Sequence, residues 1–228
     1  MNNYRFPITS ERFIAYFDIM GFRDLIYRNN HSDVKEKMDI VSGKVQNIEE
    51  YEKSYQAKAI PENPAEEAII RTIIFSDTIL MASGSNTFHD ACKTIFTATH
   101  FLSQMMANHI PIKGALAFGE MTFDIDNSIY FGKPLIDAYQ LSEENFFYGA
   151  TLHHSYEKRL TELQISPEKN FLKRAKIPMK KGKIAHYFLS WKDLFPDNYS
   201  LESLLNRFYL SVSGSTRIYV DNTIQIYM

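Results

Sequence analysis

The chain has 228 residues, of which 45% are hydrophobic and 23% are charged, and this composition predicts a globular protein with one sizeable core. The formal net charge of −2 excludes a general electrostatic attraction to nucleic acid or to an anionic membrane surface. The single cysteine, Cys92, excludes a disulfide framework and a thiolate metal cluster.

The sequence also predicts the compartment and the domain organisation. The N-terminus has no apolar signal segment, and no apolar run approaches the length of a membrane span. Together with the single cysteine, these features indicate a reducing compartment, so we expect a cytoplasmic protein. We expect residues 1–228 to form a single domain, in which the polar, proline-containing stretch 50–67 is a loop insertion.

The first predicted element is a strand that ends at an aspartate. Residues 12–18 are almost wholly apolar, as in a central strand that is covered on both faces, and Asp18 closes this strand. After Gly21 the apolar residues recur at helical spacing as far as Ile48, with a polar interruption at 29–33.

A second aspartate, Asp77, lies in the turn of a predicted hairpin. The strands of this hairpin cover 68–75 and 78–83, and a helix over about 87–108 and a strand over 112–120 follow them. The order β-α-β-β-α-β predicts an α+β protein with a ferredoxin-like sheet and its helices on one face.

The C-terminal half adds further elements to this unit. They are a short strand at 129–131, helices at 134–145 and 151–161, a basic stretch at 171–183, a strand at 184–190, a helix near 201–209 and a last strand near 223–228.

The two aspartates are the candidate functional residues. A carboxylate at the end of a buried strand is costly unless it is paired or bound to a cation. In a ferredoxin-like sheet Asp18 and Asp77 meet at one edge, where they could hold a divalent metal, most plausibly magnesium, against a triphosphate. The backbone at Gly21 could approach a phosphate, and the Ile19 carbonyl could join the metal shell. The alternative is that each aspartate caps the element that follows it.

Four segments combine into a recognisable series of motifs: a strand with Asp-Ile-x-Gly-Phe, a hairpin with Ser-Asp, a glycine-containing strand that ends in Gly-Glu, and a glycine before a helix. The matching residues are 17–22, 75–78, 113–120 and 131–135, with later matches at 187–191 and 219–223. This series resembles the class III nucleotidyl cyclases, and most closely the pyrimidine cyclases of bacterial Pycsar anti-phage systems. The resemblance covers most of residues 12–225.

The resemblance implies a metal-dependent cyclisation. Asp18, Asp77 and the Ile19 carbonyl would hold two Mg²⁺ or Mn²⁺ ions, and UTP or CTP would be converted to the 3′,5′-cyclic monophosphate and pyrophosphate. It also implies a homodimer with active sites at the interface, and a separate effector that senses the cyclic nucleotide as a second messenger in anti-phage defence. The residues that would contact the nucleotide are Ile19, Met20, Gly21, Phe22 and Ser76.

The sequence departs from the family pattern at the helix positions that usually orient the ribose and stabilise the charge of the transition state. Where many class III cyclases carry Asn and Arg on the helix after the glycine, this chain has Ile136 and Gln140. Lys113 is the catalytic candidate in their place, and the alternative for Lys113 is a surface role. The other candidate cations are Arg71, Arg217 and the cluster Lys173, Arg174, Lys176, Lys180, Lys181 and Lys183, and for that cluster we expect a solvated hairpin or arm.

The nucleobase and the reaction class leave alternatives open. The positions of the purine-reading residues of the family hold Ile73 and Ile129, which cannot hydrogen-bond a purine edge. We therefore expect a pyrimidine, with UTP favoured. The alternatives are a catalytically inactive cyclase-like nucleotide-binding or regulatory module, and a ferredoxin-like palm of another phosphotransfer enzyme, such as a cyclic-dinucleotide synthase.

Overall fold

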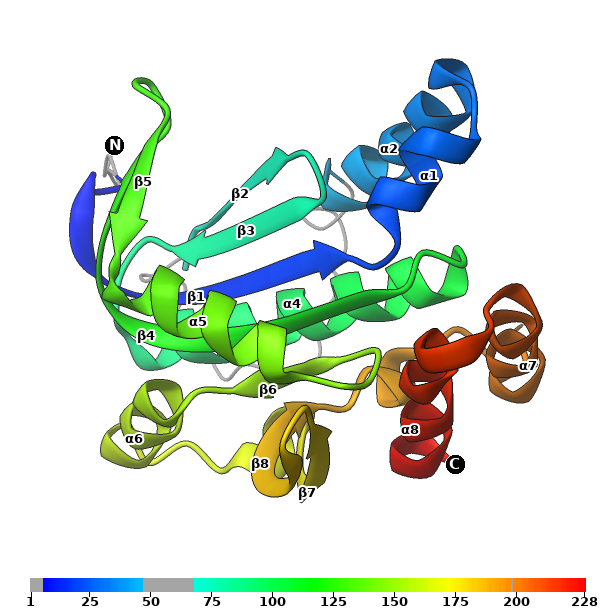
Figure 1. Cartoon of the computed structure of the whole chain (residues 1–228). Coiled ribbons are helices and arrows are strands. Elements are labelled where there is room, and N and C mark those ends of the chain that lie inside the picture. Colours follow the sequence, from blue (N-terminus) through cyan, green and yellow to red (C-terminus); the bar gives the residue numbers. More distant parts are fainter. Residues whose placement is uncertain (1–5, 47–67, 198) are drawn as a thin grey trace.

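The computed structural model describes residues 6–46, 68–197 and 199–228. In these residues a mixed sheet of eight strands forms the centre of the molecule (Figure 1), with the neighbour order β2-β3-β1-β4-β6-β8-β7 and β5 paired with β4. The predicted loop insertion at 50–67 lies outside the described residues. Within the part that is described, no helix is long and apolar enough to cross a membrane.

The strands and helices have the following bounds. The strands are β1 (Thr9–Ile19), β2 (Ile70–Phe75), β3 (Thr78–Ser83), β4 (Ile112–Asp124), β5 (Ile129–Gly132), β6 (Ala150–Leu152), β7 (Leu172–Met179) and β8 (Gly182–Leu189). The α-helices are α1 (Phe22–Arg28), α2 (His31–Gln46), α4 (Phe88–Ala107), α5 (Lys133–Glu144), α6 (His154–Glu162), α7 (Leu201–Ser211) and α8 (Arg217–Tyr227).

Strand β1 is central and covered on both faces, as the apolar run predicted. It pairs antiparallel with β3 on one side and with β4 on the other. Since side chains alternate between the faces of a strand, Phe13 and Phe17 enter the core beneath α4, whereas Ile14 and Tyr16 enter a second core beneath α5.

The βαββαβ unit and the face of its helices are confirmed. Helices α1, α2 and α4 contribute to the same core on one face of the sheet. Helix α4 begins at a capping box of Thr87 and Asp90, which satisfies N–H groups that have no intrahelical acceptor. Helix α5, which follows this unit, packs on the opposite face against β4 and β1 (Figure 1).

Two predictions for the C-terminal half are wrong. Residues 223–228 were predicted as a strand, but residues 223–227 belong to helix α8, and the late motif at 219–223 lies in the same helix. Alternating Ile224, Ile226 and Met228 are typical of a strand, but the buried positions of α8 are Val220, Thr223 and Tyr227, which have helical spacing. The helix predicted over 151–161 also begins later, because strand β6 takes its first residues.

Candidate active site

The two aspartates meet at one edge of the sheet, as the sequence predicted. Asp18 stands one residue before the end of β1, opposite Thr78 of β3 and Lys113 of β4. The turn between β2 and β3 carries Asp77, and the Asp77 carbonyl accepts a hydrogen bond from the Ile19 N–H at 2.9 Å. The hairpin turn is therefore fixed to the end of β1.

The carboxyl group of Asp18 lies in an unfavourable environment for a negative charge. Its pKa is raised to about 6, mainly by burial; Lys113 opposes this rise, and the charges of Asp77 and Glu143 add to it. A bound divalent cation would relieve both the desolvation and the repulsion between carboxylates.

The residues at this edge fit a metal that is shared with a substrate. No group of three or more His, Cys, Asp or Glu side chains in the described part of the chain forms a closed metal site. Mg²⁺ is usually held by one or two carboxylates, and water and substrate phosphates complete its octahedral shell. Asp18 and Asp77, with the Ile19 carbonyl, match that pattern.

The turn after β1 places main-chain groups beside Asp18. Gly21 has a left-handed conformation (φ 75°) and precedes the first residue of α1. Glycine is favoured there because of this backbone conformation, since a Cβ at position 21 would meet no atom within 4 Å. The Met20 N–H donates to the Pro111 carbonyl at 2.9 Å, and the Phe22 side chain is buried in the core. For a phosphate this segment therefore offers the first N–H groups of α1, which have no intrahelical acceptor.

Ser76 occupies the other half of the site, in the hairpin turn. It is exposed and has a positive φ of 55°, a conformation that is uncommon for a residue other than glycine. It directly precedes Asp77, so its hydroxyl lies on the same turn as the second carboxylate.

Lys113 is buried beside Asp18, with only 5% of its surface exposed. The close approach of β4 to β1 requires glycine at the next position, because a Cβ at Gly114 would lie 2.4 Å from the Tyr16 carbonyl oxygen. The Lys113 ammonium forms an ion pair with Glu143 of α5, and Lys180 lies 3.6 Å from the other carboxylate oxygen of Glu143.

Sequence reasoning missed Glu143. The available signal was Lys113 itself, because a lysine within an apolar strand needs a counter-charge. Tyr219 of α8 also lies in this electrostatic environment: burial, and then the charges of Glu143 and Asp18, raise its pKa.

The other candidate cations lie elsewhere. Arg71 is exposed on β2, and Arg217 donates to the Val212 carbonyl and lies over the ring of Tyr209. The basic cluster forms the exposed β7–β8 hairpin, as predicted, and Lys180 is the member that reaches Glu143.

An apolar groove of about 780 Å³ adjoins the hairpin turn. Strands β1, β2 and β3 line it on one side and α5 on the other, and Ile73 is one of its lining residues. Phe75 and Ile136 are 79% and 57% exposed there, and Gln140 is exposed on the same helix. Ile129 on β5 is half-exposed.

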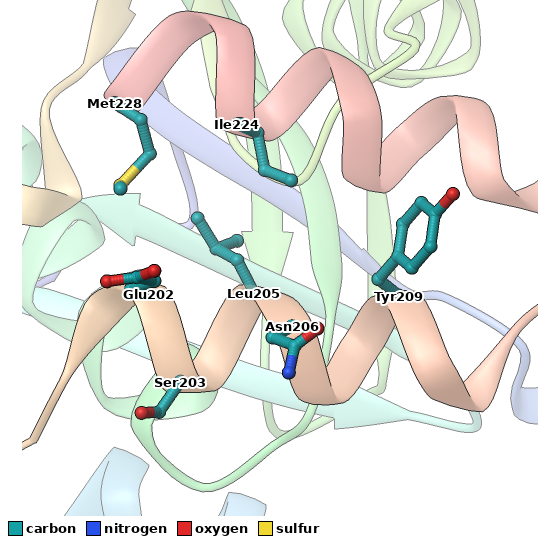
Figure 2. A pocket seen from close by; sticks show the side chains of 7 residues that line it. All are labelled: Glu202, Ser203, Leu205, Asn206, Tyr209, Ile224 and Met228. Atoms are coloured by element: carbon teal, nitrogen blue, oxygen red, sulfur yellow. The ribbon is translucent and has the colours of Figure 1, made fainter.

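A second groove, of about 520 Å³, lies between α7 and α8. Figure 2 shows Leu205 of α7 and Ile224 of α8 pointing into the space between these helices. None of the residues predicted for the site lines this groove, so it is not the candidate active site.

The comparisons with known proteins identify the fold. No protein-family model and no curated protein matches the sequence. Among solved structures, the catalytic core of a rhodopsin-guanylyl cyclase with converted specificity, in complex with ATPαS, is similar at 13% identity and a TM-score of 0.57 over 79% of this chain and 95% of that one.

Two more solved structures agree with that result. The guanylyl cyclase domain of RhoGC from the aquatic fungus Blastocladiella emersonii has 11% identity and a TM-score of 0.54, over 79% of this chain and 94% of that one. The guanylyl cyclase Cya2 has 11% identity and a TM-score of 0.52, over 79% and 91%. The chain therefore has the fold of a class III nucleotidyl cyclase catalytic domain.

Proposed function

We propose that this protein is a metal-dependent nucleotidyl cyclase that converts a nucleoside triphosphate to its 3′,5′-cyclic monophosphate and pyrophosphate. The observation that carries the proposal is the pair Asp18 and Asp77, fixed together by the Ile19–Asp77 hydrogen bond in a fold shared with guanylyl cyclases. Burial and neighbouring charge disfavour the Asp18 carboxylate in the absence of a cation.

The chain supplies the groups that this reaction needs. Asp18, Asp77 and the Ile19 carbonyl would hold two Mg²⁺ or Mn²⁺ ions, which when bound acidify the ribose 3′-hydroxyl and neutralise the departing pyrophosphate. The 3′-oxygen attacks the α-phosphorus, its proton passes to solvent, and the bond to pyrophosphate breaks. Gly21 and Phe22 contact the triphosphate through their main-chain N–H groups, with Ser76 beside them.

Lys113 is the proposed transition-state cation. The chain has no cation at Ile136 or Gln140 of α5, whereas the ammonium of Lys113 acts electrostatically on Asp18 from the neighbouring strand. A fixed positive charge in a partly desolvated site stabilises negative charge that develops on the phosphate oxygens.

A homodimer is part of the proposal. The groove beside the hairpin turn exposes Phe75 and Ile136, and large apolar side chains gathered on one face are typical of a surface that a partner covers. A second copy on this face would exclude water from the edge that carries Asp77.

We infer a pyrimidine substrate, UTP before CTP, from Ile73 and Ile129, neither of which can hydrogen-bond a purine edge. The proposed cytoplasmic location rests on the single cysteine. The role of the product as a second messenger in anti-phage defence and the separate effector rest on the resemblance of the sequence motifs to the Pycsar cyclases. An inactive nucleotide-binding module is the second candidate, because Ile136 and Gln140 replace the usual Asn and Arg.

The test is incubation of the purified protein with equal concentrations of ATP, GTP, CTP and UTP and with Mn²⁺, followed by mass spectrometry of the products. The proposal predicts cyclic UMP or cyclic CMP as the main product. Cyclic AMP or cyclic GMP would contradict the base assignment alone. Nucleotide binding without turnover would select the inactive module, and a linear or cyclic dinucleotide would select another phosphotransfer reaction.

A further inference from the structure

Two lysines from different parts of the chain converge on one carboxylate. Glu143 in the last turn of α5 pairs through one oxygen with Lys113 of β4, and its other oxygen lies 3.6 Å from the Lys180 ammonium in the β7–β8 turn. The Lys113 side chain is 6% exposed, whereas those of Glu143 and Lys180 are each 41% exposed. The carboxylate is thus partly open to solvent, whereas the Lys113 ammonium with which it pairs is buried.

The backbone around this cluster is fixed. Asn145, two residues after Glu143, is fully buried and donates to the Gly114 carbonyl at 2.7 Å. The side-chain oxygen Oδ1 of Asn145 accepts a hydrogen bond from the Thr151 hydroxyl at 3.1 Å. The end of α5 is therefore attached to β4 at the residue that follows Lys113, which holds the backbone of Glu143 close to that of Lys113 while the partly exposed Glu143 side chain remains able to move.

This arrangement matches the way in which proteins hold a phosphate. A phosphate group, like a carboxylate, can present one oxygen to each of two ammonium groups. A pair between two partly exposed side chains, such as Lys180 and Glu143, contributes little stability. A triphosphate carries several negative charges where Glu143 carries one, so it has the stronger attraction to both lysines.

We propose that Glu143 is an internal counter-ion that occupies Lys113 and Lys180 in the free protein and is displaced by the triphosphate of the substrate. The exchange is non-covalent: the carboxylate swings toward solvent, and phosphate oxygens take its place on both ammonium groups. Glu143 is thus a positioning residue that holds Lys113 at the site before substrate arrives. The choice of a triphosphate as the displacing ligand rests on the proposed function.

The test is calorimetric titration of the metal-free protein with inorganic tripolyphosphate at fixed ionic strength. Glu143→Gln removes the competing carboxylate and should tighten tripolyphosphate binding by about five-fold or more. Glu144→Gln, which removes the same charge from the adjacent position, is the matched control and should change the affinity by less than about two-fold. Adding Lys180→Gln to Glu143→Gln should weaken binding again.

The outcomes separate this proposal from the proposed function. Equal tightening in Glu143→Gln and Glu144→Gln, or no tightening in Glu143→Gln, overturns the counter-ion role even if the wild type cyclises nucleotides. Selective tightening in Glu143→Gln supports it even if no cyclic product is found. Glu143→Asp keeps the charge on a shorter side chain that reaches the lysines less well, so it should also tighten tripolyphosphate binding. It replaces Glu143→Gln in the test if that variant does not fold.

Discussion

The two surfaces that meet at the β2–β3 turn have opposite chemistry. At the charged edge, Lys113, Asp77 and Glu143 act electrostatically on Asp18, and the pKa of Asp18 is raised to about 6, mainly by burial. In the apolar groove beside it, Phe75 and Ile136 stand exposed without charged neighbours among the lining residues.

The difference indicates what each surface lacks. A carboxylate pair with one buried lysine needs further positive charge, which a divalent cation supplies. An exposed apolar groove gains stability only when other apolar surface covers it. The charged edge is therefore the proposed site of chemistry, and the groove is the proposed site of contact with a second copy.

The largest effect is expected from substitutions of the two aspartates at the charged edge. Asp18→Asn or Asp77→Asn should each lower cyclase turnover by about 100-fold or more, because each removes a proposed metal ligand. Turnover is measured with Mn²⁺ and the preferred nucleotide, and circular dichroism checks the fold. Asp24→Asn, at a side chain that is 70% exposed on α1, is the control, and activity of Asp77→Asn within a few-fold of it would exclude the metal role.

The next largest effect is expected from a substitution in the apolar groove. Phe75→Ser should weaken the proposed dimer by about tenfold, because Phe75 is 79% exposed in the single chain and its burial would contribute to association alone. Analytical ultracentrifugation measures the dissociation constant. Leu210→Ser changes a leucine on α7 that is 73% exposed, so it should leave the dimer intact. Equal dissociation constants for Phe75→Ser and Leu210→Ser would contradict the proposal that the groove forms the interface.

A smaller effect concerns stability at the charged edge. The folded-state pKa of Asp18, about 6, is above the ordinary value of 3.8, so the folded protein binds this proton more tightly than the unfolded chain does. Ionised Asp18 therefore destabilises the metal-free fold increasingly as the pH rises from about 4 to 6, and by a constant amount above that.

Asp18→Asn should remove this penalty and raise the free energy of unfolding by about 1–2 kcal/mol at pH 8. The gain should vanish near pH 4. Urea unfolding of the metal-free proteins at both pH values measures it, and a variant that is less stable than the wild type at pH 8 would contradict the account of Asp18.

The smallest effect concerns His153, which caps α6 and lies beside α5, the helix that borders both surfaces. Asp137 of α5 lies 3.7 Å from His153, whose Nδ1 caps α6 by accepting from the Ser155 N–H. Burial lowers the pKa of His153; His154, Lys133 and His186 act in the same direction, and Asp137 opposes them. The neutral cap is therefore retained above the ordinary pKa of 6.5 and is lost as the pH falls below it.

His153→Asn keeps an N-cap that does not titrate. Its stability should fall less than that of the wild type between pH 7.5 and 5.5, by roughly 0.5–1 kcal/mol, the usual contribution of a helix cap. Urea unfolding at the two pH values measures this difference. His154→Asn should retain most of the pH dependence of the wild type, because burial is the largest cause of the lowered His153 pKa. A loss of that dependence in His154→Asn but not in His153→Asn would contradict the role of His153.

The sequence predicted the charged edge because its signals are local. An apolar strand that runs into Asp18, and a hairpin turn that carries Asp77, are visible in a few residues each, and the βαββαβ order brings them together. Glu143 was not predictable in this way, since its contact with Lys113 depends on how α5 crosses the sheet.

The error at α8 has a similar origin. Residues 223–228 alternate as a strand does, and only the packing of Val220, Thr223 and Tyr227 establishes the helix, because tertiary contacts override local pattern. The exposure of Phe75 was likewise invisible, because an apolar residue in a predicted strand is ordinarily assigned to the core.

The most direct test of the central claim is the number of Mn²⁺ ions bound at the charged edge. Electron paramagnetic resonance of the wild type with 3′-deoxy-UTP, which cannot cyclise, should show about two bound ions per site. Asp18→Asn and Asp77→Asn should each lose most of this bound Mn²⁺, whereas Asp24→Asn should retain it. Undiminished Mn²⁺ binding in both Asp18→Asn and Asp77→Asn would contradict the claim that these two carboxylates form the metal site.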